Sequence, residues 1–330
     1  KMDTTPKRML FQWSLEGVIP GGGGTDGEKV EGHDRFLIPY FHKSKTNGFN
    51  YEMSDNPKND IAMDVLDKHY KVSNQGGVTV ITMKPDGPTS LGVGRNVRGE
   101  DDSIGGCNQN FKEVEKLGHT YKEDDVRDLE YKCIMKIKGL GKNGFSMSAC
   151  TGRHPSDSDP CCQGNAYMFN IEDPSASPVT FRFRKEMWHA SYHNSPEDIW
   201  THDAVPKKLD GADWFGFGFC RYNTPNKQGH VTLEAWLCPP GKDFTKKENW
   251  TMLKRIEDFN GNGWGDDGDV CHGAKDQALT WSGRQNRLKT NATSGSVDFK
   301  CVTFREIDPS SEAVSKNSRT IEKKAVKNKR

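Results

Sequence analysis

The sequence has no apolar run long enough to cross a bilayer, which excludes a helical membrane span. Net charge is also nearly missing, because 47 basic and 46 acidic residues leave a formal charge of +1 at pH 7. Without an excess of one sign, the chain as a whole has no field that attracts nucleic acid or an anionic membrane. Helical periodicity is scarce, whereas 34 of the 330 residues are glycine and only 33% are hydrophobic. This balance favours a loop-rich all-β protein over a helical bundle.

The cysteines lack the C-x-x-C pairs that are typical of structural zinc sites. There are nine of them, and Cys161 and Cys162 are adjacent, a pattern more common in disulfide-bonded secreted proteins than in metal clusters. We therefore expect a secreted, extracellular protein that is stiffened by disulfides. The alternative is a reduced protein in which strand cysteines such as Cys133 and Cys301 act as small hydrophobic residues.

Short alternating segments predict β-strands along most of the chain. In residues 128–138, Leu129, Tyr131 and Cys133 begin an apolar face, and mostly charged residues alternate with them. Within residues 214–222, Gly216 and Gly218 alternate with phenylalanines, which indicates that another group approaches the backbone closely there. The predicted strands cover residues 78–83, 128–138, 144–149, 166–171, 180–193, 214–222, 231–237 and 297–307.

Composition divides the chain into three parts. Residues 1–50 lack strong alternation and contain four consecutive glycines from Gly21, which predicts an N-terminal extension with a flexible Gly-rich linker. Residues 51–308 carry many strands at short spacing with long loops, which predicts an all-β, antiparallel two-sheet jelly-roll sandwich. Residues 309–330 are rich in Ser, Lys, Glu and Asn, which predicts a disordered basic tail.

The strand rhythm and the closing segment V-D-F-K-C-V-T-F-R-E-I, residues 297–307, resemble concanavalin A-like, or LamG-like, jelly rolls. The resemblance covers residues 51–308 at the level of architecture. That superfamily includes lectins, glycoside hydrolases and polysaccharide lyases. The resemblance therefore implies a protein that binds or cleaves sugar polymers, with the chemistry decided by the site.

Residues 180–193, T-F-R-F-R-K-E-M-W-H-A-S-Y-H, concentrate ligand-binding and reactive side chains. Phe181 and Phe183 share one parity, so a strand here has one apolar face and one face that carries charges beside an indole. Residues 184–188, R-K-E-M-W, resemble the R-x-E-x-R strand motif of alginate-lyase-type jelly rolls, with Trp188 in place of the second Arg. The Q-x-H motif and the Y-F-K-x-G strand of that family have no counterpart in this sequence.

This stretch suits β-elimination on an acidic, uronate-containing polysaccharide. Such a reaction needs a cation to neutralise the uronate carboxylate, a base to remove the neighbouring proton, and an acid for the leaving oxygen. The predicted catalytic residues are Arg184, His189 and Tyr192. The predicted substrate-binding residues are Arg182, Lys185, Glu186, Trp188, Glu234 and Trp236, which share one surface if their strands are neighbours; aromatic platforms beside polar groups suit sugar rings.

Three alternatives stay open for the same residues. The surface could bind a carbohydrate without cleaving it. Glu186 and Glu234 could act as the two carboxylates of a glycoside hydrolase. Finally, Arg184 and Glu186 could simply pair with charges on neighbouring strands and serve the fold alone.

Residues 258–269, D-F-N-G-N-G-W-G-D-D-G-D, fit the calcium-loop pattern D-x-[DN]-x-[DN]-G-x5-E, with Asp269 in place of the final Glu. They resemble calcium loops of the EF-hand, dockerin and thrombospondin type 3 kinds. The predicted ligands are the side chains of Asp258, Asn260, Asn262, Asp266 and Asp269 and the backbone carbonyl of Trp264. We expect a structural Ca2+ ion; the alternative is an acidic turn that is solvated without metal.

Overall fold

The computed structural model describes residues 33–46, 48, 50–59, 63, 68–94, 126–142, 144–151, 166–187, 191–196, 199–265, 276–280 and 285–310. The chain divides into two units, Lys1–Glu31 and Gly32–Arg330, and every described residue belongs to the second. The predicted Gly-rich linker and the predicted basic tail beyond residue 310 lie outside the described residues, so both remain expectations.

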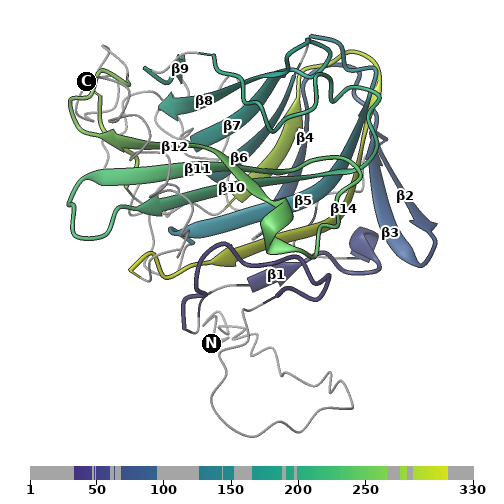
Figure 1. The fold of residues 1–330 in the computed structure, drawn as a ribbon, viewed down its shortest axis with the longest axis horizontal. Coiled ribbons are helices and arrows are strands. Elements are labelled where there is room, and N and C mark those ends of the chain that lie inside the picture. The colour runs from purple at the N-terminus through teal and green to yellow at the C-terminus, as the bar shows by residue number, and fades with distance from the viewer. Residues whose placement is uncertain are drawn as a thin grey trace, which may run out of the picture. The chain divides into compact units, whose positions relative to one another are not determined.

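Two antiparallel sheets form this unit, which confirms the predicted all-β sandwich (Figure 1). The eight-stranded sheet has the order β12-β11-β10-β5-β14-β3-β2, and β1 pairs with β14. Its strands are β1 (Asn50–Glu52), β2 (Tyr70–Gln75), β3 (Val78–Met83), β5 (Leu129–Lys138), β10 (Phe215–Asn223), β11 (His230–Cys238), β12 (Thr251–Phe259) and β14 (Ser296–Glu306). The six-stranded sheet has the order β4-β13-β6-β7-β8-β9. Its strands are β4 (Thr89–Gly94), β6 (Phe145–Thr151), β7 (Ala166–Asp173), β8 (Thr180–Met187), β9 (Ser191–Asn194) and β13 (Gln285–Thr290).

Aromatic side chains from the two sheets meet in the core between them. Phe169 of β7 stacks on Phe217 of β10 with ring centroids 4.5 Å apart, and Phe145 of β6 packs edge-on against the same ring at 6.2 Å. All three rings are buried, and burying each contributes about 1.5–3 kcal/mol. Leu129, Tyr131 and Cys133 belong to the same core, so the alternation predicted for residues 128–138 and 214–222 selects the correct inward face.

Helical structure is slight in the described part of the chain. It consists of η1 (Pro57–Asn59) and η2 (Lys247–Asn249). Among the described residues, no helix has the length and apolar character needed to cross a membrane.

Residues 180–193 form two strands instead of one continuous element. β8 ends at Met187, and Ser191 of β9 pairs back with Met187 in antiparallel register. The chain therefore reverses direction between these two residues. The sequence pattern also does not predict β1, β2, β4, β12 or β13, nor β9 as a separate element.

The predicted disulfides are not confirmed. Cys133, Cys220, Cys238 and Cys301 are free thiols, and the first of these is packed in the hydrophobic core, as the reduced alternative expects. Cys107, Cys161, Cys162 and Cys271 lie outside the described residues, as does the side chain of Cys150.

Residues 33–44, here called the cap segment, pack on the outer face of the eight-stranded sheet. Glu130 Oε2 accepts hydrogen bonds from the backbone N–H groups of Phe41 and His42, each at 3.0 Å. The Phe41 ring stacks on the indole of Trp236 with centroids 4.3 Å apart. Part of the predicted extension of residues 1–50 is therefore an integral layer over the sheet (Figure 1).

Buried charges hold the cap segment in place. Burial raises the pKa of Glu130, but the charges of Arg305 and Lys132 outweigh this effect and hold it at about 2. Arg305 Nη2 donates to Glu130 Oε2 at 2.8 Å, and Lys132 Nζ donates to the carbonyl of Pro39 at 2.7 Å. Because these charged groups alternate with core residues along their strands, they project outward and meet the cap segment instead of water.

Candidate functional site

A groove opens on the outer face of the six-stranded sheet and encloses a cavity of about 310 Å³. Short or flexible side chains, among them Ser146, Met168 and Asn170, form its floor. Arg184 and Lys289 line its two sides. The volume lies at the lower end of the range of about 300–1,000 Å³ that is usual for small-molecule pockets.

The strand register explains the shape of the groove. Ser146 of β6 pairs with Lys289 of β13 on one side and with Asn170 of β7 on the other, and Asn170 pairs with Arg182 of β8. Directly paired residues project from the same face of a sheet. This row therefore runs from a long cation across two short polar side chains to a second long cation.

The next row along the strands repeats the arrangement. Ser148 pairs with Arg287 and with Met168, and Met168 pairs with Arg184. Both rows thus place cations over β13 and β8 and shorter side chains over β6 and β7. The result is a trough with a partly polar floor between two cationic sides.

Glu172 and Asn194 orient the arginines and the asparagine of the groove. Glu172 accepts from Asn170 Nδ2 at 2.9 Å through Oε1 and from Arg184 Nη2 at 3.1 Å through Oε2. Arg182 Nη1 donates to Asn194 Oδ1 at 2.8 Å. These contacts preorganise the groove, because a side chain that is already held loses less entropy when a ligand binds.

Two buried polar atoms of the groove lack a hydrogen-bond partner among the described residues. They are Asn170 Oδ1, an acceptor, and Arg184 Nε, a donor. A buried polar atom without a partner costs about 1–3 kcal/mol. Each atom exposes less than 1 Å² to solvent, so a ligand contacts it only after the side chain moves.

The cations of the groove influence each other's ionisation. Burial, more than any other cause, lowers the pKa of Lys289 below the ordinary lysine value of 10.5. The nearby Arg287 and Arg184 lower this pKa further, whereas Glu186 raises it. Lys289 is therefore a partly desolvated ammonium within a cationic cluster, and an added anion would stabilise its charged form.

The structure brings together part of the predicted site on β8. Arg182, Arg184 and Glu186 lie on the outer, groove-bearing face of the sheet, as their parity predicts. Tyr192 of β9 is the register partner of Glu186, which places it at the neighbouring position across the strand pair. Trp188 and His189 lie outside the described residues, so their roles remain predictions.

Lys185 occupies the interior, which differs from the groove position expected for it. It shares the parity of Phe181 and Phe183, and its Nζ donates to Asp258 Oδ2 of β12 at 2.9 Å between the sheets. The hydroxyl of Tyr167 also donates to this carboxylate oxygen. A fully buried ammonium with such partners does not reach a ligand on the outer face.

Glu234 and Trp236 lie on the other sheet, which corrects the expectation of one shared surface. Both project from the outer face of the eight-stranded sheet, beneath the cap segment, whereas Glu186 projects from the outer face of the six-stranded sheet. Glu186 and Glu234 therefore do not flank a common bond. The glycoside hydrolase alternative that pairs them has no geometric support.

The predicted calcium loop is not confirmed. Asn262 Oδ1 accepts from the backbone N–H of Trp264, and Asn260 Oδ1 accepts from the backbone N–H of Ala278, each at 2.9 Å. Asp258, the predicted first ligand, lies within β12 and already holds a lysine ammonium, so a Ca2+ ion there would meet a positive charge at close range. The oxygen atoms of Asp258, Asn260 and Asn262 therefore do not form a suitable site for a Ca2+ ion. Two further predicted ligands, Asp266 and Asp269, lie outside the described residues, and the predicted role of the Trp264 carbonyl remains a prediction.

The sequence patterns did not identify most residues of the groove's floor, nor the cationic side of the groove over β13. Ser146 and Asn170 lie at outward positions of correctly predicted strands, but nothing local marks them as part of a site. Lys289 was missed because β13, Q-N-R-L-K-T, was not identified as a strand. Its single core residue, Leu288, gives almost no alternation signal.

No known protein family matches this chain, and no curated protein matches it. Among solved structures, the carbohydrate-binding module CBM66 from Bacillus subtilis is 12% identical, covers 75% of this chain and 98% of that chain, and has a TM-score of 0.36. A β-glucanase from Bacillus licheniformis is 10% identical over 80% of this chain and 100% of its own, with a TM-score of 0.38. The Ca2+-bound VIP36 exoplasmic/lumenal domain is 9% identical over 75% and 84%, with a TM-score of 0.36. At these identities and TM-scores the likenesses carry no argument about what this chain binds, and they do not confirm the resemblance to alginate-lyase-type jelly rolls.

Proposed function

We propose that the groove on the six-stranded sheet binds an acidic polysaccharide. The observation that carries the proposal is the pair of register rows in which Arg182 and Arg184 face Arg287 and Lys289 across a floor of short side chains. Such a trough accepts an extended polymer, with its carboxylates or sulfates directed toward the cationic sides. A secreted location, expected from the cysteine pattern, suits a ligand of this kind.

The mixed lining of the groove suits a sugar better than a simple anion. Asn170 and Arg184 line the groove, and their side chains offer an amide for a hydroxyl group and a guanidinium for an anionic oxygen. Met168 is the register partner of Arg184 and lies two residues before Asn170 on β7, and it offers an apolar contact for the face of a sugar ring. A ligand with hydroxyl groups, an apolar ring face and negative charge meets all three requirements.

Binding of polygalacturonate and alginate, compared with neutral dextran, tests the proposal. We expect calorimetric binding of the acidic polymers only, and weaker binding as salt screens the charges. Arg184→Gln or Lys289→Gln should reduce the affinity about tenfold, the loss expected when a hydrogen bond of about 1.4 kcal/mol to a charged group is removed. Lys136→Gln is the matched control, because Lys136 lies on the other sheet and pairs with Asp213 at 3.0 Å. Equal binding of dextran, or equal losses in all three variants, would contradict the proposal.

A second candidate function is β-elimination of uronate residues in the same groove. The register between β8 and β9, in which Tyr192 is opposite Glu186 and Asn194 is opposite Arg184, supports this candidate. In this mechanism Arg184 neutralises the uronate carboxylate and thereby acidifies the proton at the neighbouring carbon. Tyr192 or His189 then removes that proton and protonates the leaving oxygen.

Ultraviolet absorbance of unsaturated products separates cleavage from binding. A lyase produces this absorbance from polygalacturonate or alginate, and His189→Ala and Tyr192→Phe lose the product while they retain binding. Binding without product would leave a noncatalytic carbohydrate-binding protein. Unchanged turnover in both variants would remove the catalytic assignment of these two residues.

A further inference from the structure

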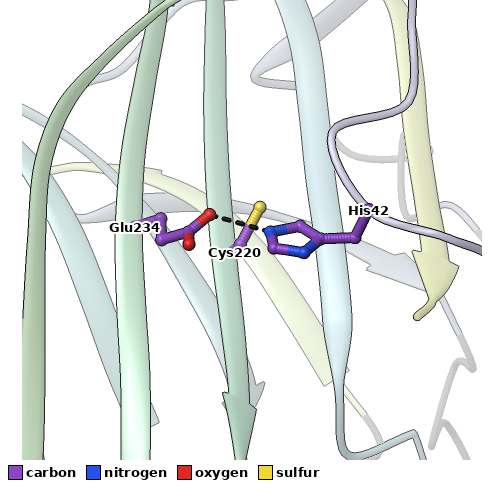
Figure 2. Close-up of side chains that lie close together, drawn as sticks. All are labelled: His42, Cys220 and Glu234. Atoms are coloured by element: carbon purple, nitrogen blue, oxygen red, sulfur yellow. Dashed lines mark hydrogen bonds and ion pairs between the residues drawn. The ribbon is translucent and has the colours of Figure 1, made fainter. Parts of the chain in front are cut away.

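Three side chains able to ligate a metal ion converge under the cap segment, on the sheet that does not carry the groove. Figure 2 shows His42, Cys220 and Glu234 directed toward one another, each from a different element. The imidazole nitrogen, the sulfur and a carboxylate oxygen all lie within 4.8 Å of one another, and all three residues are buried. The groove function proposed above uses none of them.

The backbone fixes the relative positions of these residues. Cys220 of β10 and Glu234 of β11 are direct register partners, so both project from the outer face of the eight-stranded sheet. His42 lies above them because its backbone N–H donates to Glu130 at 3.0 Å and its carbonyl accepts from Arg305. The arrangement therefore does not depend on long, mobile side chains.

We propose that His42, Cys220 and Glu234 bind a divalent metal ion of the zinc class, and that this ion fastens the cap segment to the eight-stranded sheet. Imidazole nitrogen, thiolate sulfur and carboxylate oxygen are the three donor types found in zinc sites. Ca2+ and Mg2+ prefer sites made only of oxygen, so this donor set selects against them.

Two of the three ligand atoms, the imidazole nitrogen and the carboxylate oxygen, need only a small adjustment to admit the ion. His42 Nε2 and Glu234 Oε2 are 2.8 Å apart, which is a direct hydrogen bond. Tetrahedral coordination with zinc–nitrogen and zinc–oxygen bonds of about 2.0–2.1 Å separates two such ligand atoms by about 3.3 Å. The two side chains therefore open by roughly half an ångström as two bonds to the ion replace the hydrogen bond. When the metal binds, the Cys220 thiol proton passes to solvent. The proton held between His42 Nε2 and Glu234 Oε2 moves to His42 Nδ1, so that Nε2 presents its lone pair to the ion.

Neighbouring hydrogen bonds already orient the carboxylate ligand. The hydroxyl of Tyr222 donates to Glu234 Oε1 at 2.8 Å, and Trp236 Nε1 donates to Glu234 Oε2 at 3.1 Å. Partners of this kind usually support metal-ligating carboxylates. The three protein ligands leave one tetrahedral position for a small ligand such as water.

The competing explanation is a hydrogen-bonded pair of His42 and Glu234 that needs no metal. Such a pair does not use the sulfur of Cys220, whereas a metal site does. Cys238 provides a matched control, because it is also a buried free thiol on β11 but does not belong to the group of three. Comparing Cys220→Ala with Cys238→Ala therefore isolates ligation from the general effect of removing a buried thiol.

The test titrates the full-length, metal-free protein with Zn2+, with Ca2+ and with Co2+. We expect one tightly bound zinc that is lost in Cys220→Ala and kept in Cys238→Ala. At a hundredfold excess over Kd, zinc should raise the Tm by about 5 °C in the wild type and in Cys238→Ala, while Ca2+ leaves the Tm unchanged. Bound Co2+ should show a thiolate-to-metal charge-transfer band, a signal that a merely structural role of the thiol does not produce.

Other results would overturn the proposal. A zinc stoichiometry that is the same in Cys220→Ala and in the wild type would place the ion elsewhere. A Co2+ spectrum without the thiolate band would exclude Cys220 as a ligand even if the alanine variant failed to fold. No zinc binding at micromolar concentrations would leave only the hydrogen-bonded pair.

Discussion

Lys185 Nζ and Asp258 Oδ2 form a buried ion pair at 2.9 Å that joins the two sheets of the sandwich. Burial, the largest influence on both groups, lowers the pKa of Lys185 and raises the pKa of Asp258. Both directions show that desolvation outweighs the mutual attraction of the charges. The pair therefore specifies how β8 and β12 face each other more than it adds to stability.

Replacing one partner of this pair should lower the free energy of unfolding strongly, whereas replacing both should lower it much less. Asp258→Leu leaves the Lys185 charge uncompensated, so we expect a loss of about 3–5 kcal/mol in the free energy of unfolding, measured by urea denaturation. Asp258→Leu combined with Lys185→Met should recover most of that loss. Glu257→Gln is the control, because Glu257 precedes Asp258 on β12 but pairs with the exposed Lys227 in the turn between β10 and β11. Its loss should cost less than about 1 kcal/mol. A double variant as unstable as the sum of its single variants would contradict this interpretation.

The sequence could place Lys185 on a face but could not reveal its partner. Its parity with Phe181 and Phe183 already predicts an inward position, and the charge of the side chain argues against that position. The conflict is resolved by Asp258, which lies 73 positions along the chain and in the other sheet. Contacts of this range depend on strand pairing, and local alternation does not encode strand pairing.

The same limit explains the error over Glu234 and Trp236. Alternation placed both correctly on the outward face of β11, but sheet membership comes from the partners of a strand. β11 pairs with β10 and β12, whereas β8 pairs with β7 and β9. The predicted groove therefore combined residues from opposite surfaces of the sandwich.

Glycine in β10 was interpreted correctly as a sign of close approach. The approaching groups, however, are aromatic rings of the same chain instead of a ligand. A Cβ atom on Gly216 would lie 2.4 Å from Trp250 Cη2, and one on Gly218 would lie 3.0 Å from Phe41 Cε2. Trp250 and Phe41 come from distant segments of the chain. The sequence alone therefore could not show whether the group that approaches these glycines belongs to the protein or to a ligand.

Gly216→Ala should displace the indole of Trp250. The indole cannot retreat freely, because its Nε1 donates to the carbonyl of Phe244 at 2.8 Å. We expect a loss of about 1–3 kcal/mol in unfolding free energy, as is usual for overpacking. The indole atoms are the nearest neighbours of the added Cβ, and Cys238 Cβ at 2.9 Å is the next. Combining the change with Trp250→Leu removes the nearer contacts, so the double change should cost less than the sum of the two single changes.

A substitution at a second glycine serves as the control, because it introduces backbone strain without a clash. Gly211 has a φ of +79°, and a Cβ atom added to it would meet nothing within 4 Å, so the cost of Gly211→Ala comes from its backbone conformation alone. That cost should add to the cost of Trp250→Leu within about 0.5 kcal/mol. If the costs of Gly216→Ala and Trp250→Leu also added in the double variant, the contact with Trp250 would not be the cause of the destabilisation by Gly216→Ala.

The affinity of the groove for acidic polysaccharide should fall as the pH rises from neutral toward 10.5. The pKa of Lys289 lies below the ordinary lysine value of 10.5, chiefly because of burial and then because of Arg287 and Arg184, and only Glu186 opposes them. The ammonium therefore loses its proton at a lower pH than an ordinary lysine, and the groove then loses one cation. An anionic ligand binds the protonated form more tightly, so affinity decreases once the pH passes the pKa of the free protein.

Lys289→Arg distinguishes this cause from a general effect of pH, because guanidinium stays protonated throughout the range. Affinities measured by calorimetry at constant ionic strength should decline with pH in the wild type and stay nearly flat in Lys289→Arg. The polymer carboxylates are ionised over the whole range and do not contribute to the change. A decline of equal size in both proteins would mean that Lys289 does not contact the ligand, and the cationic side of the groove over β13 would then need to be assigned to Arg287 alone.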